Sequence, residues 1–215
     1  MRHSGRDGCA EAGAAPLRPC GVHDLRGFGQ GRELRYPARD LLVVSGLPGS
    51  GKSTLMERVA AGVTRVDSQD VRAEFARRLP RRLPYGVYRP LVRAVHYWRL
   101  RRAVRGGGPL VVHDCGAQRW VRSWLGRTAR RQGRGLHLLL LDVSAEQAVG
   151  GQLERGRVVS DGAFARHRLG WGRLLAEVEA AAADDARTLP AGAVSAVLLD
   201  RVGAQASQAV RFGGG

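Results

Sequence analysis

The segment that most constrains this chain is LLVVSGLPGSGKST, which runs from Leu41 to Thr54. An apolar run predicts a strand, a glycine-rich turn follows, and Lys52 begins an amphipathic helix. Gly46 and Gly51, followed by Lys52 and Ser53, occupy every fixed position of the phosphate-binding loop pattern Gly-x-x-x-x-Gly-Lys-Ser. The strand before the loop and the helix after it are the context that this pattern needs, so a chance glycine-rich turn is the weaker interpretation.

The residue types of this loop suit a chain of phosphates. Glycines adopt backbone conformations that other residues avoid, so successive N–H groups can turn toward one anion, and the helix start adds further N–H groups and a positive dipole end. We expect Lys52 to reach the β- and γ-phosphates of ATP and the Ser53 hydroxyl to bind Mg²⁺. The predicted nucleotide-binding residues are Gly46, Leu47, Pro48, Gly49, Ser50, Gly51, Lys52, Ser53 and Thr54.

Lys52 is the only lysine in the chain, and the other strongly basic side chains are all arginines. A lone ammonium group where a compact point charge is needed fits the different chemistry of the two side chains. The formal net charge of +16 favours anionic partners, namely nucleotides, an anionic or phosphorylated acceptor, or nucleic acid. The charge alone does not choose among these partners.

Composition also bears on location. No apolar run approaches the ~20 residues that a membrane-spanning helix needs, and the N-terminus lacks the apolar centre of a secretory signal. Cys9, Cys20 and Cys115 are too far apart for a disulfide framework or a metal-ligand motif. We therefore expect a cytoplasmic protein without membrane contact.

The chain divides at about residue 40. Residues 1–39 are rich in Gly, Ala and Arg and show no sustained period, which predicts a disordered tail in which Glu33–Tyr36 alone is a candidate to pack on the domain edge. Residues 40–212 form the predicted domain. Its predicted strands are Asp40–Ser45, Thr64–Asp67, Leu110–His113, Leu136–Asp142 and Ala193–Asp200.

Helical patterns separate these strands. We predict helices over about 52–61, 67–79, 91–104, 117–132, 144–154 and 164–183, a loop over 80–90, and a short last helix ending near Val210. Leu91, Trp98 and Trp120 are expected on the buried sides of their helices, and Ser144 with Gln147 resembles a capping box. The alternation predicts an α/β fold, a five-stranded parallel sheet with helices on both faces in three α/β/α layers.

Ligands of such sheets bind beyond the carboxyl ends of the strands. Here those ends carry the phosphate loop and four acids, which are Asp67, Asp114, Asp142 and Asp200.

With these features the chain resembles the P-loop kinase group of nucleoside triphosphatases. It is similar, over about residues 40–212, to the small AAA domain proteins related to polynucleotide kinase, zeta toxin, gluconate kinase and adenylylsulfate kinase. The resemblance implies Mg²⁺-dependent transfer of the γ-phosphoryl group of ATP to an acceptor hydroxyl. It implies that Asp67 or Asp114 holds the metal through water and that Arg155 and Arg157 belong to a lid that closes on the phosphates.

The sequence departs from this group at Gln69, where many members have the acid that activates the acceptor hydroxyl. An amide cannot accept a proton as a general base. Either the neighbouring Asp70 takes the role, or an acid from elsewhere does, or transfer to a hydroxyl is weak. Asp70 would otherwise be a first-turn acid facing the helix dipole.

Two other functions remain open at this point. The first is an ATPase or nucleotide-dependent switch, in which Gln69 orients an attacking water. The second is a non-catalytic nucleic-acid-binding module that uses the arginine-rich segment Arg77–Arg105, although a solvated helix face would have the same composition.

Overall fold

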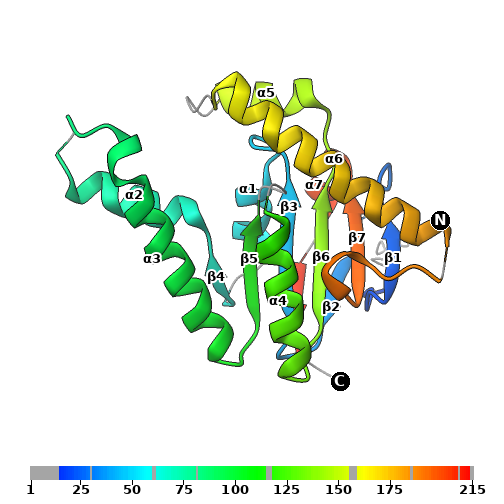
Figure 1. Ribbon diagram of the computed structural model, residues 1–215. Coiled ribbons are helices and arrows are strands. Elements are labelled where there is room, and N and C mark those ends of the chain that lie inside the picture. The colour runs from blue at the N-terminus through cyan, green and yellow to red at the C-terminus, as the bar shows by residue number, and fades with distance from the viewer. Residues whose placement is uncertain are drawn as a thin grey trace, which may run out of the picture.

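The computed structural model describes residues 15–29, 31–59, 62–80, 82–114, 118–154, 159–184, 186–207 and 209–213. Its centre is a six-stranded, entirely parallel sheet in the order β1-β7-β6-β3-β5-β4, beside a two-stranded parallel sheet of β2 and β8 (Figure 1). The strands are β1 (Gly21–Asp24), β2 (Glu33–Tyr36), β3 (Leu41–Gly46), β4 (Thr64–Val66), β5 (Leu110–Asp114), β6 (Leu136–Leu141), β7 (Ser195–Leu199) and β8 (Ala209–Phe212).

Helices cover both faces of the large sheet, as predicted. Figure 1 shows α4 and α6 on the near face and α1 on the far face. The helices are α1 (Lys52–Val59), α2 (Ser68–Arg78), α3 (Tyr85–Arg105), α4 (Arg119–Arg131), α5 (Ala145–Leu153), α6 (Asp161–Ala183) and α7 (Arg201–Ala206), with a short 3₁₀ turn over Pro190–Gly192. The capping box at the start of α5 is confirmed, because Ser144 and Gln147 exchange both hydrogen bonds. No helix of the described ranges is both long and apolar enough to cross a bilayer.

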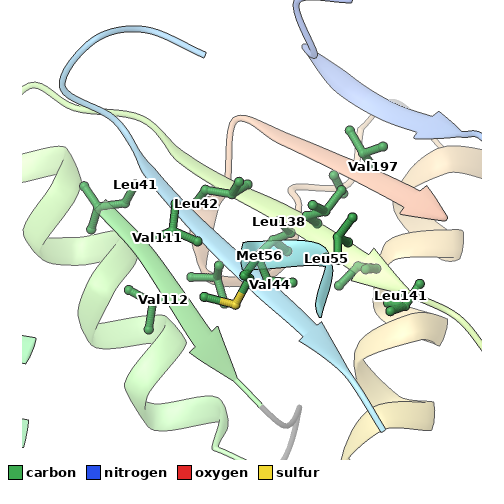
Figure 2. Packing of buried hydrophobic residues seen from close by; sticks show 14 of the residues in the cluster. Leu41, Leu42, Val44, Leu55, Met56, Val111, Val112, Leu138, Leu141 and Val197 are labelled. Carbon is green, nitrogen blue, oxygen red and sulfur yellow. The ribbon is translucent and has the colours of Figure 1, made fainter. Parts of the chain in front are cut away.

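The core lies around β3, which has β5 on one side and β6 on the other. All residues of β3 and β6 are buried, as expected for central strands covered on both faces. Figure 2 shows Leu55 and Met56 of α1 packed among side chains of these strands. This packing fixes the strand that leads into the phosphate loop and the helix that leaves it.

The structure corrects the predicted disorder of residues 1–39 for the part that it describes. β1 extends the sheet along the edge of β7, and β2 pairs with β8, so that Leu34 and Tyr36 are buried. The expected packing of Glu33–Tyr36 is confirmed. The last predicted helix ends earlier, at Ala206, and β8 follows it. Strands of four residues contain too little periodicity to be recognised, and each becomes stable by pairing with a partner far along the chain.

A second correction concerns the helix pair α2 and α3, which extends to one side of the sheet beyond β4 (Figure 1). The predicted loop over 80–90 is helical from Tyr85, and the predicted buried side is wrong: Leu91 and Trp98 are 58% and 59% exposed. The buried residues are instead spaced four or eight residues apart along one side of the helix: Tyr88, Val92, Leu100 and Val104. Trp120 of α4 is also exposed.

Buried polar side chains join the amino ends of three strands. His137 lies between two partners, with Nε2 3.0 Å from Asp40 Oδ2 and Nδ1 2.8 Å from Ser195 Oγ. Asp40 also accepts a hydrogen bond from the Gly135 N–H at 2.9 Å. The contacts of Asp40, His137 and Ser195 resemble those of a catalytic triad. All three side chains are buried at the sheet edge opposite to the phosphate loop, so their role is structural.

Candidate active site

The phosphate loop connects β3 to α1 and needs its glycines. Gly49 and Gly51 have φ angles of 88° and 97°, a conformation that costs other residues energy. A Cβ at Gly49 would lie 2.0 Å from the carbonyl oxygen of Ala148 in α5, and one at Gly46 would lie 2.7 Å from that of Leu141 in β6. The loop is therefore in close contact with the ends of two neighbouring elements.

Lys52 is buried within this loop and points back along it. Its Nζ donates to the carbonyl oxygens of Gly46 at 2.9 Å and Leu47 at 2.6 Å, and it lies 3.3 Å from the Ser50 hydroxyl. The positive charge thus lies inside the loop, where an anion bound by the backbone N–H groups would meet it.

A cavity of about 100 Å³, which we call the loop cavity, lies beside these residues. Its lining combines Gly49, Gly51, Lys52 and Ser53 with Gln69, His113 and Gln152. Thr54 is exposed at the start of α1 and does not line it.

Gln152 is a residue of this site that the sequence reasoning missed. Its amide nitrogen donates to the carbonyl oxygen of Pro48 at 3.2 Å, and its amide oxygen accepts from the Val159 N–H at 2.9 Å. It therefore links the loop to the segment that precedes α6. Nothing in its sequence neighbourhood marks it, because its role depends on α5 packing against the loop.

A larger cavity of about 290 Å³, the lateral cavity, adjoins the loop cavity. It lies between the α2–α3 pair, the end of β5 and α4, and shares Pro48, Gln69, His113 and Val159 with the loop cavity. Its polar lining includes Arg72, Arg89, Arg93, Arg122, His96, His167, Tyr85 and Asp114.

Asp67 ends the segment after β4 and begins α2. Its carboxylate accepts a hydrogen bond from the Gln69 N–H at 2.8 Å and so caps the helix. Burial raises the pKa of Asp67, while the Gln69 hydrogen bond and the nearby His96 and Lys52 act in the opposite direction. Asp67 lines neither cavity, but its Oδ1 lies 3.4 Å from Nδ1 of His113, a residue that lines both.

His113 lines both cavities and lies beside Asp67. Burial, with the nearby Lys52 ammonium, lowers the pKa of His113 to about 3, so the imidazole is neutral near pH 7. Its Nδ1 lies 3.4 Å from an Asp67 oxygen but forms no hydrogen bond within the described part of the chain. Because this nitrogen is closed to solvent, His113 lines the two cavities with its other atoms.

Asp114 ends β5 and is held in a buried ion pair. Its Oδ2 accepts from Arg122 Nη1 at 2.7 Å and from the Ser45 hydroxyl at 3.2 Å, and the Asp114 and Arg122 side chains are 11% and 5% exposed. The predicted role of Asp114 as a metal acid stays a prediction.

The other predicted site residues are scattered. Asp70 is exposed in the first turn of α2 and lines neither cavity, whereas Gln69 lines both. Arg155 and Arg157 lie outside the described residues, so their lid role also stays a prediction.

The N-terminal segment binds the last two acids of this sheet edge. Arg26 Nη1 lies 2.9 Å from Asp142 Oδ2, and the Gly27 N–H donates to Asp200 at 2.9 Å. Arg26 also pairs with Asp24 and Glu179, and its three carboxylate partners raise its pKa. These two acids are therefore structural.

The residues present fit a nucleotide-bound Mg²⁺. Among the described residues, no group of three or more His, Cys, Asp or Glu side chains could hold a metal by itself. Mg²⁺ at a nucleotide needs fewer protein ligands, because phosphates and water complete its six oxygens. The Ser53 hydroxyl at the loop cavity and the Asp67 carboxylate, 3.4 Å from the cavity residue His113, are ligands of the right chemistry.

Three solved structures are similar to this chain, and the first of them has a TM-score that supports the fold. A putative kinase from Chloroflexus aurantiacus is 15% identical with a TM-score of 0.53, over 77% of this chain and 87% of that one. A gluconokinase from Sinorhizobium meliloti is 20% identical with a TM-score of 0.46, over 77% and 84%. A chain of the PezAT toxin–antitoxin system of Streptococcus pneumoniae is 13% identical with a TM-score of 0.47, and this chain spans only 55% of its length.

Sequence comparison assigns the family. No curated protein matches the chain. A family model described as "AAA domain" matches residues 41–179, which is more than half of the chain and includes the phosphate loop, both cavities' central residues and most of α6. With its P-loop fold, the chain belongs to this AAA domain family.

Proposed function

We propose that this protein is a kinase that transfers the γ-phosphoryl group of ATP to a hydroxyl group of a small acceptor. The observation that carries the proposal is the meeting of two cavities at Gln69 and His113. The loop cavity suits a phosphate chain, and the lateral cavity of about 290 Å³ lies near the lower limit of small-molecule sites. A site that only hydrolysed ATP would need room for one water.

In this proposal, Lys52 and the N–H groups of the loop bind the phosphates. Ser53 and Asp67 would hold Mg²⁺, which neutralises phosphate charge when it is bound. Holding donor and acceptor side by side supplies much of the rate of such a transfer, because phosphoryl transfer depends mainly on positioning and charge stabilisation. Arg155 and Arg157 stay our candidates for a lid over the phosphates.

We assign the orientation of the acceptor hydroxyl to Asp114 rather than to Asp70. Asp114 lines the lateral cavity, whereas Asp70 does not. Its ion pair with Arg122 fixes the direction of the carboxylate. A loose transition state makes a weak demand on the base, so orientation of the hydroxyl is the main role proposed for Asp114.

One observation favours a second candidate, ATP hydrolysis. Gln69 lies where the cavities meet, and its amide could orient a water molecule toward the phosphates. The comparisons offer no support for the third candidate, a nucleic-acid-binding module.

Incubation with γ-labelled ATP, Mg²⁺ and metabolite pools separates the two reactions. Label on an organic acceptor supports the kinase, and free labelled phosphate alone supports the ATPase. Lys52→Ala should reduce either turnover about 100-fold or more, because it removes a charge that stabilises the transition state. Lys52→Arg is the matched variant that keeps the charge, and a Lys52→Ala protein with full ATP affinity and turnover would exclude the phosphate-loop assignment.

A further inference from the structure

We propose that the lateral cavity binds a small hydroxylated acceptor that also carries an anionic group, either a phosphate or a carboxylate. The inference rests on the proposed function in one respect, that the acceptor hydroxyl receives the phosphoryl group. The anion-binding step itself does not depend on phosphoryl transfer and can be measured separately.

The first argument is the charge of the cavity wall. Arg72, Arg89, Arg93 and Arg122 line the cavity, and within the described ranges Asp114 is the only carboxylate that lines it. Arg122 is paired with that carboxylate. Among the described residues, the other three guanidinium groups have no carboxylate partner within 4.0 Å, so their charge is available to a ligand.

The second argument is the distribution of acids on the same two helices. Glu74 pairs with Arg78 at 2.7 Å and with Arg99 at 2.6 Å, and neither of these arginines lines the cavity. Glu74 therefore neutralises arginines that lie outside the cavity. The cavity side keeps its excess positive charge, as a site for an anion requires.

The third argument is that Arg72 is held in place. Its guanidinium lies over the Tyr85 ring at 4.2 Å, and Tyr85 meets Tyr88 edge to face at 5.3 Å. Tyr88 in turn stacks on Phe75 in the small core of the helix pair. A guanidinium fixed on an aromatic face offers its N–H groups in a defined direction, which suits the two oxygens of a carboxylate or phosphate.

The fourth argument concerns the hydroxyl groups. Polar side chains line the cavity beside the arginines, among them the His96 and His113 rings and the Gln69 and Gln118 amides. Imidazole and amide groups donate and accept hydrogen bonds, which suits hydroxyl groups next to an anion. A sugar acid or a sugar phosphate has this chemistry and a compatible size.

Calorimetric titration of the full chain tests this. The probes are D-gluconate and D-glucose 6-phosphate, with D-sorbitol and D-glucose as uncharged counterparts, each with and without saturating ADP and Mg²⁺ to fill the phosphate loop. We expect an anionic probe to bind at least about tenfold more tightly than its counterpart, the usual scale of a charge-assisted hydrogen bond. The more strongly bound probe distinguishes phosphate from carboxylate.

Variants of α3 locate the binding. Arg89→Gln and Arg93→Gln should each weaken the anionic probe about fivefold or more, while Arg101→Gln, an exposed arginine of the same helix outside the cavity, should not. Equal affinity for charged and uncharged probes, no binding of any probe, or an equal loss in Arg101→Gln overturns the inference. Binding of a fluorescent ATP analogue is measured on the same samples. A protein that binds the anionic probe but not the nucleotide would refute the proposed kinase function and leave the assignment of the lateral cavity standing.

Discussion

The buried pair of Asp114 and Arg122 allows a quantitative test of the site. Arg122→Met removes the guanidinium but keeps much of the volume of the side chain, and it leaves the Asp114 carboxylate almost without access to water. Breaking a buried pair on one side costs about 3–5 kcal/mol, because the remaining charge is uncompensated. At this chain length about 2–4 °C of melting temperature corresponds to each kcal/mol.

The double variant Arg122→Met/Asp114→Asn removes both charges and should recover much of this loss. The measurement is the free energy of unfolding in urea for the wild type, both single variants and the double variant. We expect a coupling free energy of at least about 1.5 kcal/mol from the cycle. A coupling energy near zero would mean that the two side chains do not interact at the 2.7 Å contact, and would refute both the pair and the orienting role that we assign to it.

Three other predictions concern separate parts of the chain. Gly49→Ala should abolish nucleotide binding measured by fluorescence titration, because its Cβ would meet the Ala148 carbonyl at 2.0 Å in a left-handed conformation; retained binding would contradict the described loop. Because the folded-state pKa of His113 is lowered to about 3, its contribution to stability is complete above the unfolded pKa of ~6.5 and is lost as the pH falls toward 3. Between pH 7 and pH 5 the free energy of unfolding should thus fall more steeply in the wild type than in His113→Asn, by up to about 1.4 kcal/mol per pH unit. Equal slopes in the two proteins would refute the buried neutral ring. Ser144→Ala should cost about 1 kcal/mol in urea unfolding, as a lost helix cap does, whereas the exposed Ser160, which makes no side-chain cap, should tolerate the same change.

The phosphate loop and the central strands could be predicted from the sequence because their information is local. A fixed glycine and lysine spacing defines the loop, and a continuous apolar run defines a strand buried on both faces, such as β6. The five predicted strands correspond to β3, β4, β5, β6 and β7. The order of these strands in the sheet follows from pairing, which no single segment encodes.

Other features depend on contacts between distant segments. The apolar residues of α3 allow two helical faces, and packing against α2 and β4 selects the face of Val92 and Leu100 over that of Leu91 and Trp98. Gln152 resembles any polar residue late in a helix until its contact with Pro48 is known. Gln69, by contrast, lines both cavities, and the expectation that the reaction departs from related kinases at this position stays a prediction.

The N-terminal segment has a consequence for the charge balance of the molecule. Arg26 and Gly27 bind two carboxylates at the same sheet edge as the phosphate loop, while β1 covers the backbone of β7. A shortened protein beginning at Asp40 would leave the carboxylates of Asp142 and Asp200 without these partners. It would also expose the edge of β7, and an unpaired edge strand favours self-association. Negative potential released at that edge would repel an incoming triphosphate. Residues that look dispensable in sequence thus help to keep the nucleotide side of the sheet attractive to anions.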